Sequence, residues 1–223
     1  MKLVAILGSP HGMQGNTGIL LDGVLQAVRA EGAEVEVFSL DKLDVKPCLG
    51  CDACHISGEC AIDDDFERIR GAFEAADGLI LASPNYIVSV SAQLKALLDR
   101  CSPLLHLQSI AGKYAVAVET SGGPGGEEVQ AYLLRFLRML GYATVGSVGA
   151  LGWQMSNEAM KAKPLAAADE LGRRLVKAIA EKQEFLEQQA ERQAMYERMK
   201  QLMTMTREHW PYEYAYWAAN HGL

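Results

Sequence analysis

The segment KLVAILGSPHGMQGNTG, residues 2–18, indicates the fold of this chain. It opens with a continuous apolar run, partly β-branched, which is typical of a buried strand and is stopped by Gly8 and Pro10. A polar, glycine-containing loop follows. It leads into residues 17–32, where apolar side chains recur with helical spacing up to a C-terminal glycine, Gly32. This order of strand, polar loop and helix is the opening unit of an α/β domain with a parallel sheet.

The same alternation continues to about residue 150. Four more strands are predicted, at residues 34–40, 78–84, 113–120 and 143–150, with helices at residues 64–76, 91–105 and 127–141. The helix over 91–105 should break near Pro103. Right-handed crossovers between these units favour a flavodoxin-like, doubly wound, five-stranded parallel sheet. We therefore predict an α/β domain over residues 1–160.

A C-terminal helical extension is expected over residues 161–223. Residues 164–210 lack strand and turn signals and are rich in Ala, Glu, Gln, Arg and Met, which predicts one or two long helices. Residues 210–217 then gather five aromatic side chains. The Met-rich run at residues 195–205 is typical of a packing surface.

Composition limits the classes of function. The 223 residues are 49% hydrophobic and 22% charged, which is normal for a globular protein with a core. A net charge of −7 argues against nucleic acid or an anionic membrane as the partner. No stretch approaches the roughly 18 apolar residues of a membrane span, and residues 1–12 do not read as a signal peptide. We expect a cytoplasmic protein with reduced thiols.

Ligands of open α/β sheets bind outside the carboxyl ends of the strands, so the loops at those ends are candidate sites. Residues 8–18 bring polar side chains and free amides to a helix N-terminus, which attracts phosphate. Tyr86 offers a flat face after Pro84, and residues 122–126 hold four glycines that permit close backbone approach. Each loop alone also fits a simpler role: a helix cap at Asn16 or Thr17, a packed tyrosine, or a flexible connector.

The loop KPCLGCDACHISGECAIDDD, residues 46–65, contains Cys48, Cys51, Cys54 and Cys60. A disulfide is disfavoured by the reducing compartment, and zinc sites more often join two separated C-x2-C knuckles across a long gap. Two consecutive x2 spacings can wrap an iron–sulfur cubane, although the last spacer is five residues rather than three and Ala61 replaces the usual proline. Structural or redox-active free thiols are a further alternative.

The remaining candidates receive structural interpretations. Cys101 should be a small buried hydrophobe, and His55 a loop side chain. The acidic run at residues 63–65 should lie at a helix N-terminus. No metal-ligand spacing links the other histidines, which are His11, His106, His209 and His221.

Taken together, the three strand-end loops resemble the NADPH-dependent FMN reductase branch of the flavodoxin-like superfamily. The motifs are G-S-P…G-N-T at residues 8–17, S-P-N-Y at residues 83–86 and T-S-G-G at residues 120–123. The resemblance implies FMN, with the first loop on the phosphate and the other two along the isoalloxazine. Many relatives carry arginine where this chain has His11. The implied flavin-binding residues are Ser9, His11, Asn16, Thr17, Pro84, Asn85, Tyr86, Thr120, Ser121, Gly122 and Gly123.

The cysteine loop resembles that of the iron–sulfur flavoproteins, which combine this fold with a four-cysteine [4Fe–4S] loop after strand two. The resemblance implies that Cys48, Cys51, Cys54 and Cys60 are cluster ligands and that electrons pass between the cluster and FMN. No side chain is expected to be catalytic, because the flavin does the chemistry. The alternatives are a NAD(P)H-dependent FMN or quinone reductase without a cluster, and a zinc-stabilised binding module that is not an enzyme.

Relatives assemble as dimers or tetramers, and the helical extension suits such contacts. We therefore expect a homodimer or homotetramer with a small-molecule or protein redox partner. Alternatively, the extension packs on its own domain.

Overall fold

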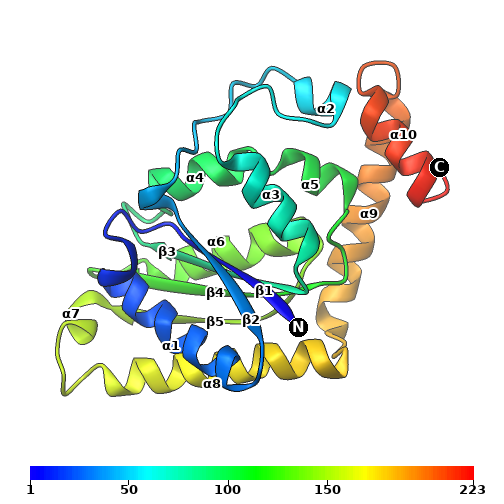
Figure 1. The fold of residues 1–223 in the computed structure, drawn as a ribbon. Helices are drawn as coiled ribbons and strands as arrows, with labels where there is room; N and C mark the ends of the chain where they lie inside the picture. The colour runs from blue at the N-terminus through cyan, green and yellow to red at the C-terminus, as the bar shows by residue number, and fades with distance from the viewer.

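The computed structural model describes residues 1–223 and contains a five-stranded, all-parallel sheet in the order β2-β1-β3-β4-β5 (Figure 1). The strands are β1 (Lys2–Leu7), β2 (Glu34–Ser39), β3 (Gly78–Pro84), β4 (Tyr114–Ser121) and β5 (Ala143–Leu151). Strand β1 pairs with both β2 and β3, Leu3 lying opposite Val35 on one side and Gly78 on the other. This order confirms the predicted flavodoxin-like fold.

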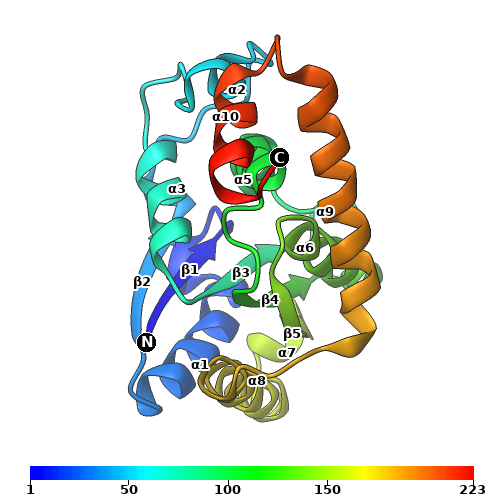
Figure 2. The ribbon, with the colours of Figure 1, turned by 90° about the vertical axis from the view of Figure 1, so that its right-hand side faces the viewer.

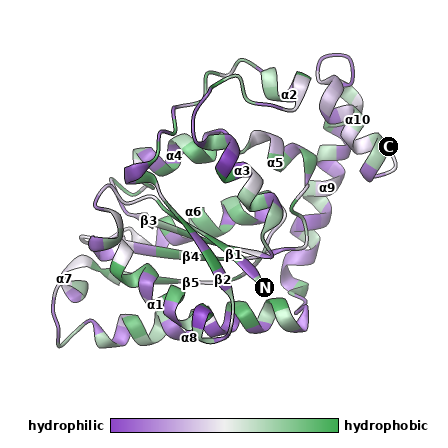
Figure 3. Cartoon of the chain, in the orientation of Figure 1, coloured by the Kyte–Doolittle hydropathy of each residue, from purple (hydrophilic) through white to green (hydrophobic).

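Helices cover both faces of the sheet. On one face lie α1 (Asn16–Ala30) and α8 (Ala162–Glu181), and on the other α3 (Phe66–Ala75), α4 (Ala92–Asp99), α5 (Ser102–Leu107) and α6 (Gly126–Met139). The side chains of β1 lie alternately in the two hydrophobic cores, one on each face of the sheet, because successive residues of a strand point to opposite faces. Figure 3 shows apolar residues gathered along the strands, with polar and apolar residues alternating along the helices.

Short elements complete the connections. They are the 3-10 turns η1 (Gly12–Gln14) and η2 (Leu40–Lys42) and the helices α2 (Ala53–Ser57) and α7 (Gly152–Met155). The predicted break near Pro103 falls at residues 100–101. Pro103 itself lies in the first turn of α5, where its missing N–H costs no hydrogen bond.

The C-terminal segment forms two long helices, as predicted, and one more that was not. Helix α8 packs against α1 and β5, α9 (Leu186–Thr206) against α6, and α10 (Pro211–Asn220) against α2 and α5 (Figure 2). Met199 and Met203 are buried against Leu107 and Trp217 in a small core between α5, α9 and α10. The prediction that the Met-rich run is a packing surface is confirmed, and the segment packs on its own chain.

Two further sequence predictions can be checked here. Cys101 is buried as expected, and burial raises the pKa of its thiol to about 12. No helix combines the length and the apolar character that crossing a bilayer would require.

Candidate functional site

A cleft of about 190 Å³ opens at the carboxyl ends of β1, β3 and β4. All of the predicted flavin-binding residues except Gly123 line it. Gly123 lines the neighbouring cavity, and Gly152 joins the cleft from the start of α7. Sequence reasoning missed Gly152 because no motif surrounds it. The three loops therefore converge on one space, as the topology requires of adjacent strand ends.

The loop after β1 presents groups to this cleft that can bind an anion. Ser9 and Thr17 are each 2% exposed, and Thr17 Oγ1 lies 2.6 Å from Thr120 Oγ1. The simpler alternative for this loop, a helix cap at Asn16 or Thr17, does not hold, since the capping position is Gly15 and no side chain bonds the first amides. These amides are free for a ligand at the positive end of the helix dipole.

No lysine or arginine lines the cleft, and the exposed His11 is the only lining side chain that can become cationic. The backbone N–H of His11 donates to Ser9 Oγ at 3.2 Å, which orders the turn. A bound phosphate would therefore be held mainly by hydroxyls and amides.

The loop after β3 forms the opposite wall. Asn85 donates its backbone N–H to Thr120 O at 2.8 Å, whereas its buried Oδ1 has no partner in the protein. Such an atom fits an N–H donor of a bound ring, because an unpaired buried acceptor is costly. The next residues, Ile87 and Val88, form a turn with φ of 54° and 57°, although β-branched side chains disfavour this region. Strain of this kind is concentrated at ligand sites.

The four loop cysteines line a second cavity, of about 240 Å³. All are free thiols, so no disulfide forms. Leu49, Ile62 and Phe66 contribute apolar lining. No three of these sulfurs lie within 4.8 Å of one another.

A buried arginine supplies positive charge to this cavity. Arg100 is 3% exposed, donates from Nη2 to Cys60 Sγ at 3.2 Å, and forms an ion pair with Asp64. Its Nε is buried without a partner. Burial would raise the pKa of Asp64, but hydrogen bonds from Arg100 and from the backbone of Lys46 and Phe66 lower it overall. The bond from Phe66 N confirms Asp64 at a helix N-terminus. The cavity therefore suits an anionic cluster of thiolates.

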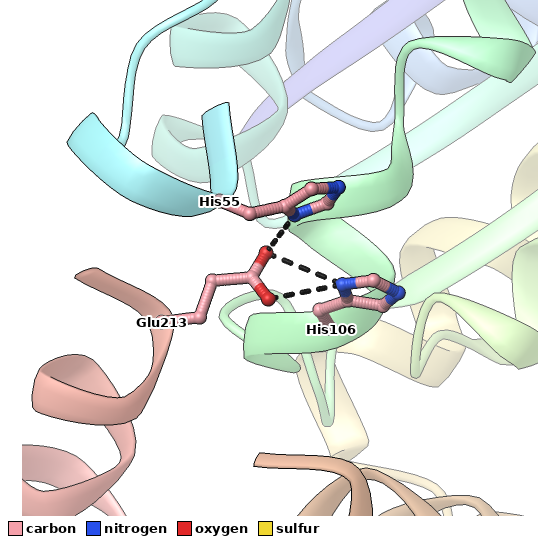
Figure 4. A group of neighbouring side chains, drawn as sticks. All are labelled: His55, His106 and Glu213. Carbon is pink, nitrogen blue, oxygen red and sulfur yellow. Dashed lines mark hydrogen bonds and ion pairs between the residues drawn. The ribbon is translucent and has the colours of Figure 1, made fainter. Parts of the chain in front are cut away.

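Sequence reasoning missed a group of side chains behind the cysteine loop, shown in Figure 4. Glu213 of α10 is fully buried and accepts from His55 Nδ1 at 2.6 Å and from His106 Nδ1 at 3.0 Å. Trp210 stacks on both imidazoles, with centroids 4.5 and 5.1 Å away. The prediction that His55 is only a loop side chain is therefore wrong, and His106, which no metal-ligand spacing linked to another residue in the sequence, contacts Glu213. No local pattern could have linked residues more than 100 positions apart.

The charges of this group support one another. Burial would lower the pKa of His55, but interactions with Cys54 and Glu213 raise it to about 10. Burial would raise the pKa of Glu213, whereas the two histidines lower it. The group is therefore a charged hydrogen-bond network, which we call the Glu213 network: His55, His106, Trp210 and Glu213.

Glu119 is a buried carboxyl close to the flavin cleft. It is 1% exposed and lines a cavity of about 420 Å³ that shares Ser121 with the cleft. Burial raises its pKa from 4.5 to about 7, although hydrogen bonds to Ser121 and Gln130 act in the opposite direction.

This shift predicts a pH-dependent stability. Because the folded pKa of Glu119 exceeds the unfolded pKa, stability should fall as pH rises from about 4.5 to about 7. Glu119→Gln should therefore be more stable than wild type at pH 8.5, by about 3 kcal/mol, and differ little at pH 5. Urea unfolding at both pH values checks this. An equal difference at the two pH values would refute the assignment.

Comparison with known proteins agrees with the fold. The family model for NADPH-dependent FMN reductase matches residues 1–155. An iron–sulfur flavoprotein of Archaeoglobus fulgidus is 34% identical over 186 residues, which cover 82% of each chain. One from Methanocaldococcus jannaschii is 42% identical over 55% of this chain and 65% of its own. The crystal structure of RosB shares the fold, with a TM-score of 0.67 at 16% identity over 89% of this chain and 87% of RosB.

The sheet order and the strand-end cleft define a flavodoxin-like flavoprotein. The chain belongs to the NADPH-dependent FMN reductase family and, by its curated relatives, to the iron–sulfur flavoproteins. It is a flavin-dependent oxidoreductase, and FMN is the flavin that the family uses.

Proposed function

We propose that this protein passes electrons between a [4Fe–4S] cluster held by the cysteine loop and FMN held in the strand-end cleft. The observation that carries the proposal is the convergence of Cys48, Cys51, Cys54 and Cys60 on one cavity beside the buried Arg100. A cluster moves single electrons and FMN can store two, so such a pair can split or join electron pairs. The names of the curated relatives support the cluster.

In this proposal the residues of the cleft hold the flavin and do no acid–base chemistry. Ser9, Asn16 and Thr17, with the amides of α1, bind the phosphate. Asn85 and its neighbours Pro84 and Tyr86 orient the ring, and residues 120–123 border its far edge. RosB, which shares the fold, carries a bound riboflavin-5'-phosphate derivative, which supports a flavin as the ligand of this fold.

No lysine or arginine lines the cleft where the phosphate is placed, so adding one tests that placement. His11→Arg should tighten FMN binding by roughly fivefold, since an added ion pair at a partly exposed site contributes up to about 1 kcal/mol. The gain should shrink in high salt because screening weakens exposed ion pairs. Fluorescence titration of the apoprotein with FMN checks this, with the exposed His209→Arg as control for added charge. Equal gains in both variants would contradict the placement of the phosphate.

The two cavities share no lining residue, so the cofactors would occupy separate parts of one chain. We infer a homodimer or homotetramer in which cofactors of different chains approach each other, acting in the cytoplasm on a small-molecule or protein redox partner. Light scattering coupled to gel filtration should give two or four chains, and a monomer with both cofactors bound would contradict it.

Rapid mixing tests the electron transfer itself. Anaerobic holoprotein is mixed with limiting dithionite, and freeze-quenched samples are examined by electron paramagnetic resonance while flavin absorbance is followed. The reduced-cluster signal should rise and then decay as the flavin becomes reduced. If the cluster signal does not change after mixing, and NADPH added in place of dithionite reduces the flavin, the protein would instead be a nicotinamide-dependent reductase that does not use a cluster.

A further inference from the structure

Helix α10 links the cysteine loop to the rest of the chain, and it lies beside both α2 and α5 (Figures 1 and 2). Its contact with α5 is firm: Trp217 Nε1 donates to His106 O at 2.9 Å, and the buried Trp217 ring joins Leu107 in the small C-terminal core. Its contact with α2 reaches the segment that carries Cys54. The C-terminal helix therefore connects a predicted cluster ligand to a well-packed part of the protein.

The cysteine loop has little structure of its own to fix its shape. Residues 46–52 are all exposed, and they include two of the four cysteines. Cys54 follows in α2, a helix of only five residues flanked by two left-handed residues, Asp52 and Gly58. So short a helix is not stable by itself in water. Arg70 Nη1 donates to Gly58 O at 2.8 Å, after the helix has ended, so further contacts must hold α2 itself.

Helix α10 and its capping residue Trp210 supply three such contacts. Glu213 Oε1 lies 2.6 Å from His55 Nδ1, and the Trp210 ring stacks on the same imidazole with the centroids 4.5 Å apart. The Tyr212 ring packs directly against Gly58, since a Cβ at Gly58 would lie 2.4 Å from that ring. These contacts reach α2 at its middle and at its C-terminal end.

The next cysteine, Cys60, is held by other elements. Its backbone N–H donates to Glu67 Oε1 at 3.0 Å, and its sulfur accepts from Arg100 Nη2 at 3.2 Å. Neither partner belongs to the C-terminal extension. The contacts from α10 therefore bear on Cys54 and not on Cys60.

We propose that α10 is a clasp for the cysteine loop: Tyr212 and Glu213 are positioning residues that hold α2, and with it Cys54, in the place that the cluster requires. The inference rests on the proposed [4Fe–4S] cluster. A cluster is lost when one of its ligands moves away, so its lifetime should depend on how often α2 opens locally. The C-terminal extension thereby takes part in the cluster site although it contains no cysteine.

The test compares four variants as anaerobic holoproteins. Tyr212→Ala removes the ring that packs on Gly58, and Tyr212→Phe keeps that ring. Tyr132→Ala is the matched control, because Tyr132 lies on another helix, α6, and is 38% exposed where Tyr212 is 39% exposed. Glu213→Gln removes the charge that faces His55.

Two rates are measured: iron release from the holoprotein to an added ferrous-iron chelator, and hydrogen exchange of the amides of residues 53–58. Both rates should rise about tenfold in Tyr212→Ala and in Glu213→Gln, as the loss of one favourable contact in a local opening equilibrium would give. Tyr212→Phe and Tyr132→Ala should keep the wild-type rates. Exchange in the buried strand β3 should stay unchanged throughout, which separates opening of α2 from general destabilisation. Tyr212 is partly exposed, so Tyr212→Ala carries the test even if Glu213→Gln fails to fold.

Three outcomes separate the claims. Wild type without iron would overturn the proposed cluster and with it this inference. Wild type with a full cluster and unchanged iron release in Tyr212→Ala would overturn the inference alone, even if residues 53–58 exchanged faster. Equal acceleration in Tyr132→Ala would also overturn it, because the effect would then not come from the contact with α2.

Discussion

Replacing Cys51 by serine is expected to remove most of the iron from the protein, from about four atoms per chain to less than one. Three thiolates cannot occupy the four corners of a cubane, and serine is a poor ligand for these irons. FMN content should stay within about 20% of wild type, because the cysteine cavity and the flavin cleft share no residue. Iron, sulfide and flavin assays on one anaerobic preparation measure both effects.

The control for this loss is Cys101→Ser. Cys101 is buried outside the cysteine loop and bonds Leu97 O, so its replacement should leave the iron content unchanged. Retention of iron in Cys51→Ser, or equal loss in both variants, would contradict the assignment of the loop cysteines.

Arg100→Met is expected to destabilise the apoprotein by ~3–5 kcal/mol, because it leaves the buried carboxylate of Asp64 without its cation. Both side chains of this pair are at most 1% exposed. The matched control is Arg68→Met. Arg68 pairs with Asp65 at 3.6 Å on the protein surface, and this ion pair should contribute less than about 1 kcal/mol to the free energy of unfolding. Urea unfolding of the apoproteins at pH 7 gives both values.

The pH dependence of that loss tests its cause. The folded pKa of Asp64 lies below its ordinary value of 3.8, so its stabilisation is present above that pH and is lost as pH falls through the folded value. The difference between Arg100→Met and wild type should therefore shrink below pH 3.8. A difference that is constant with pH would mean that Arg100 stabilises by packing on Phe66, which its guanidinium covers at 4.3 Å.

The sequence predicted the sheet because the information for it is local. Strands such as β3, buried at every position, are continuous apolar runs. The helical connections make the strands parallel, and all but the one from β2 to β3 join neighbouring strands of the sheet. Helix α10 lies within the predicted helical extension but was not predicted as a separate helix, because its residues 211–220 lack a clear apolar period. Their aromatic side chains find partners only on α2 and α5. Packing between distant elements overrode the local pattern there.

The two candidate sites were predictable to the same extent. The cysteine spacing and the three strand-end motifs are continuous in sequence. The structure places the four cysteines in one cavity and all of the predicted flavin-binding residues except Gly123 in another. Arg100, Glu119 and Glu213 were not identified, because their importance comes from burial and from partners elsewhere in the chain. The sequence around a charged residue does not show whether that residue is buried. Its burial is known only from the packing of the folded chain.

The central claim is that one chain carries both a [4Fe–4S] cluster and FMN. Visible absorption of protein purified without oxygen, with iron and acid-labile sulfide assayed on the same sample, tests this most directly. The account predicts flavin bands above a broad iron–sulfur absorbance, with about four irons and four sulfides per chain. Flavin bands without iron or sulfide would contradict it and would make the protein a flavin reductase whose cysteine loop has another use.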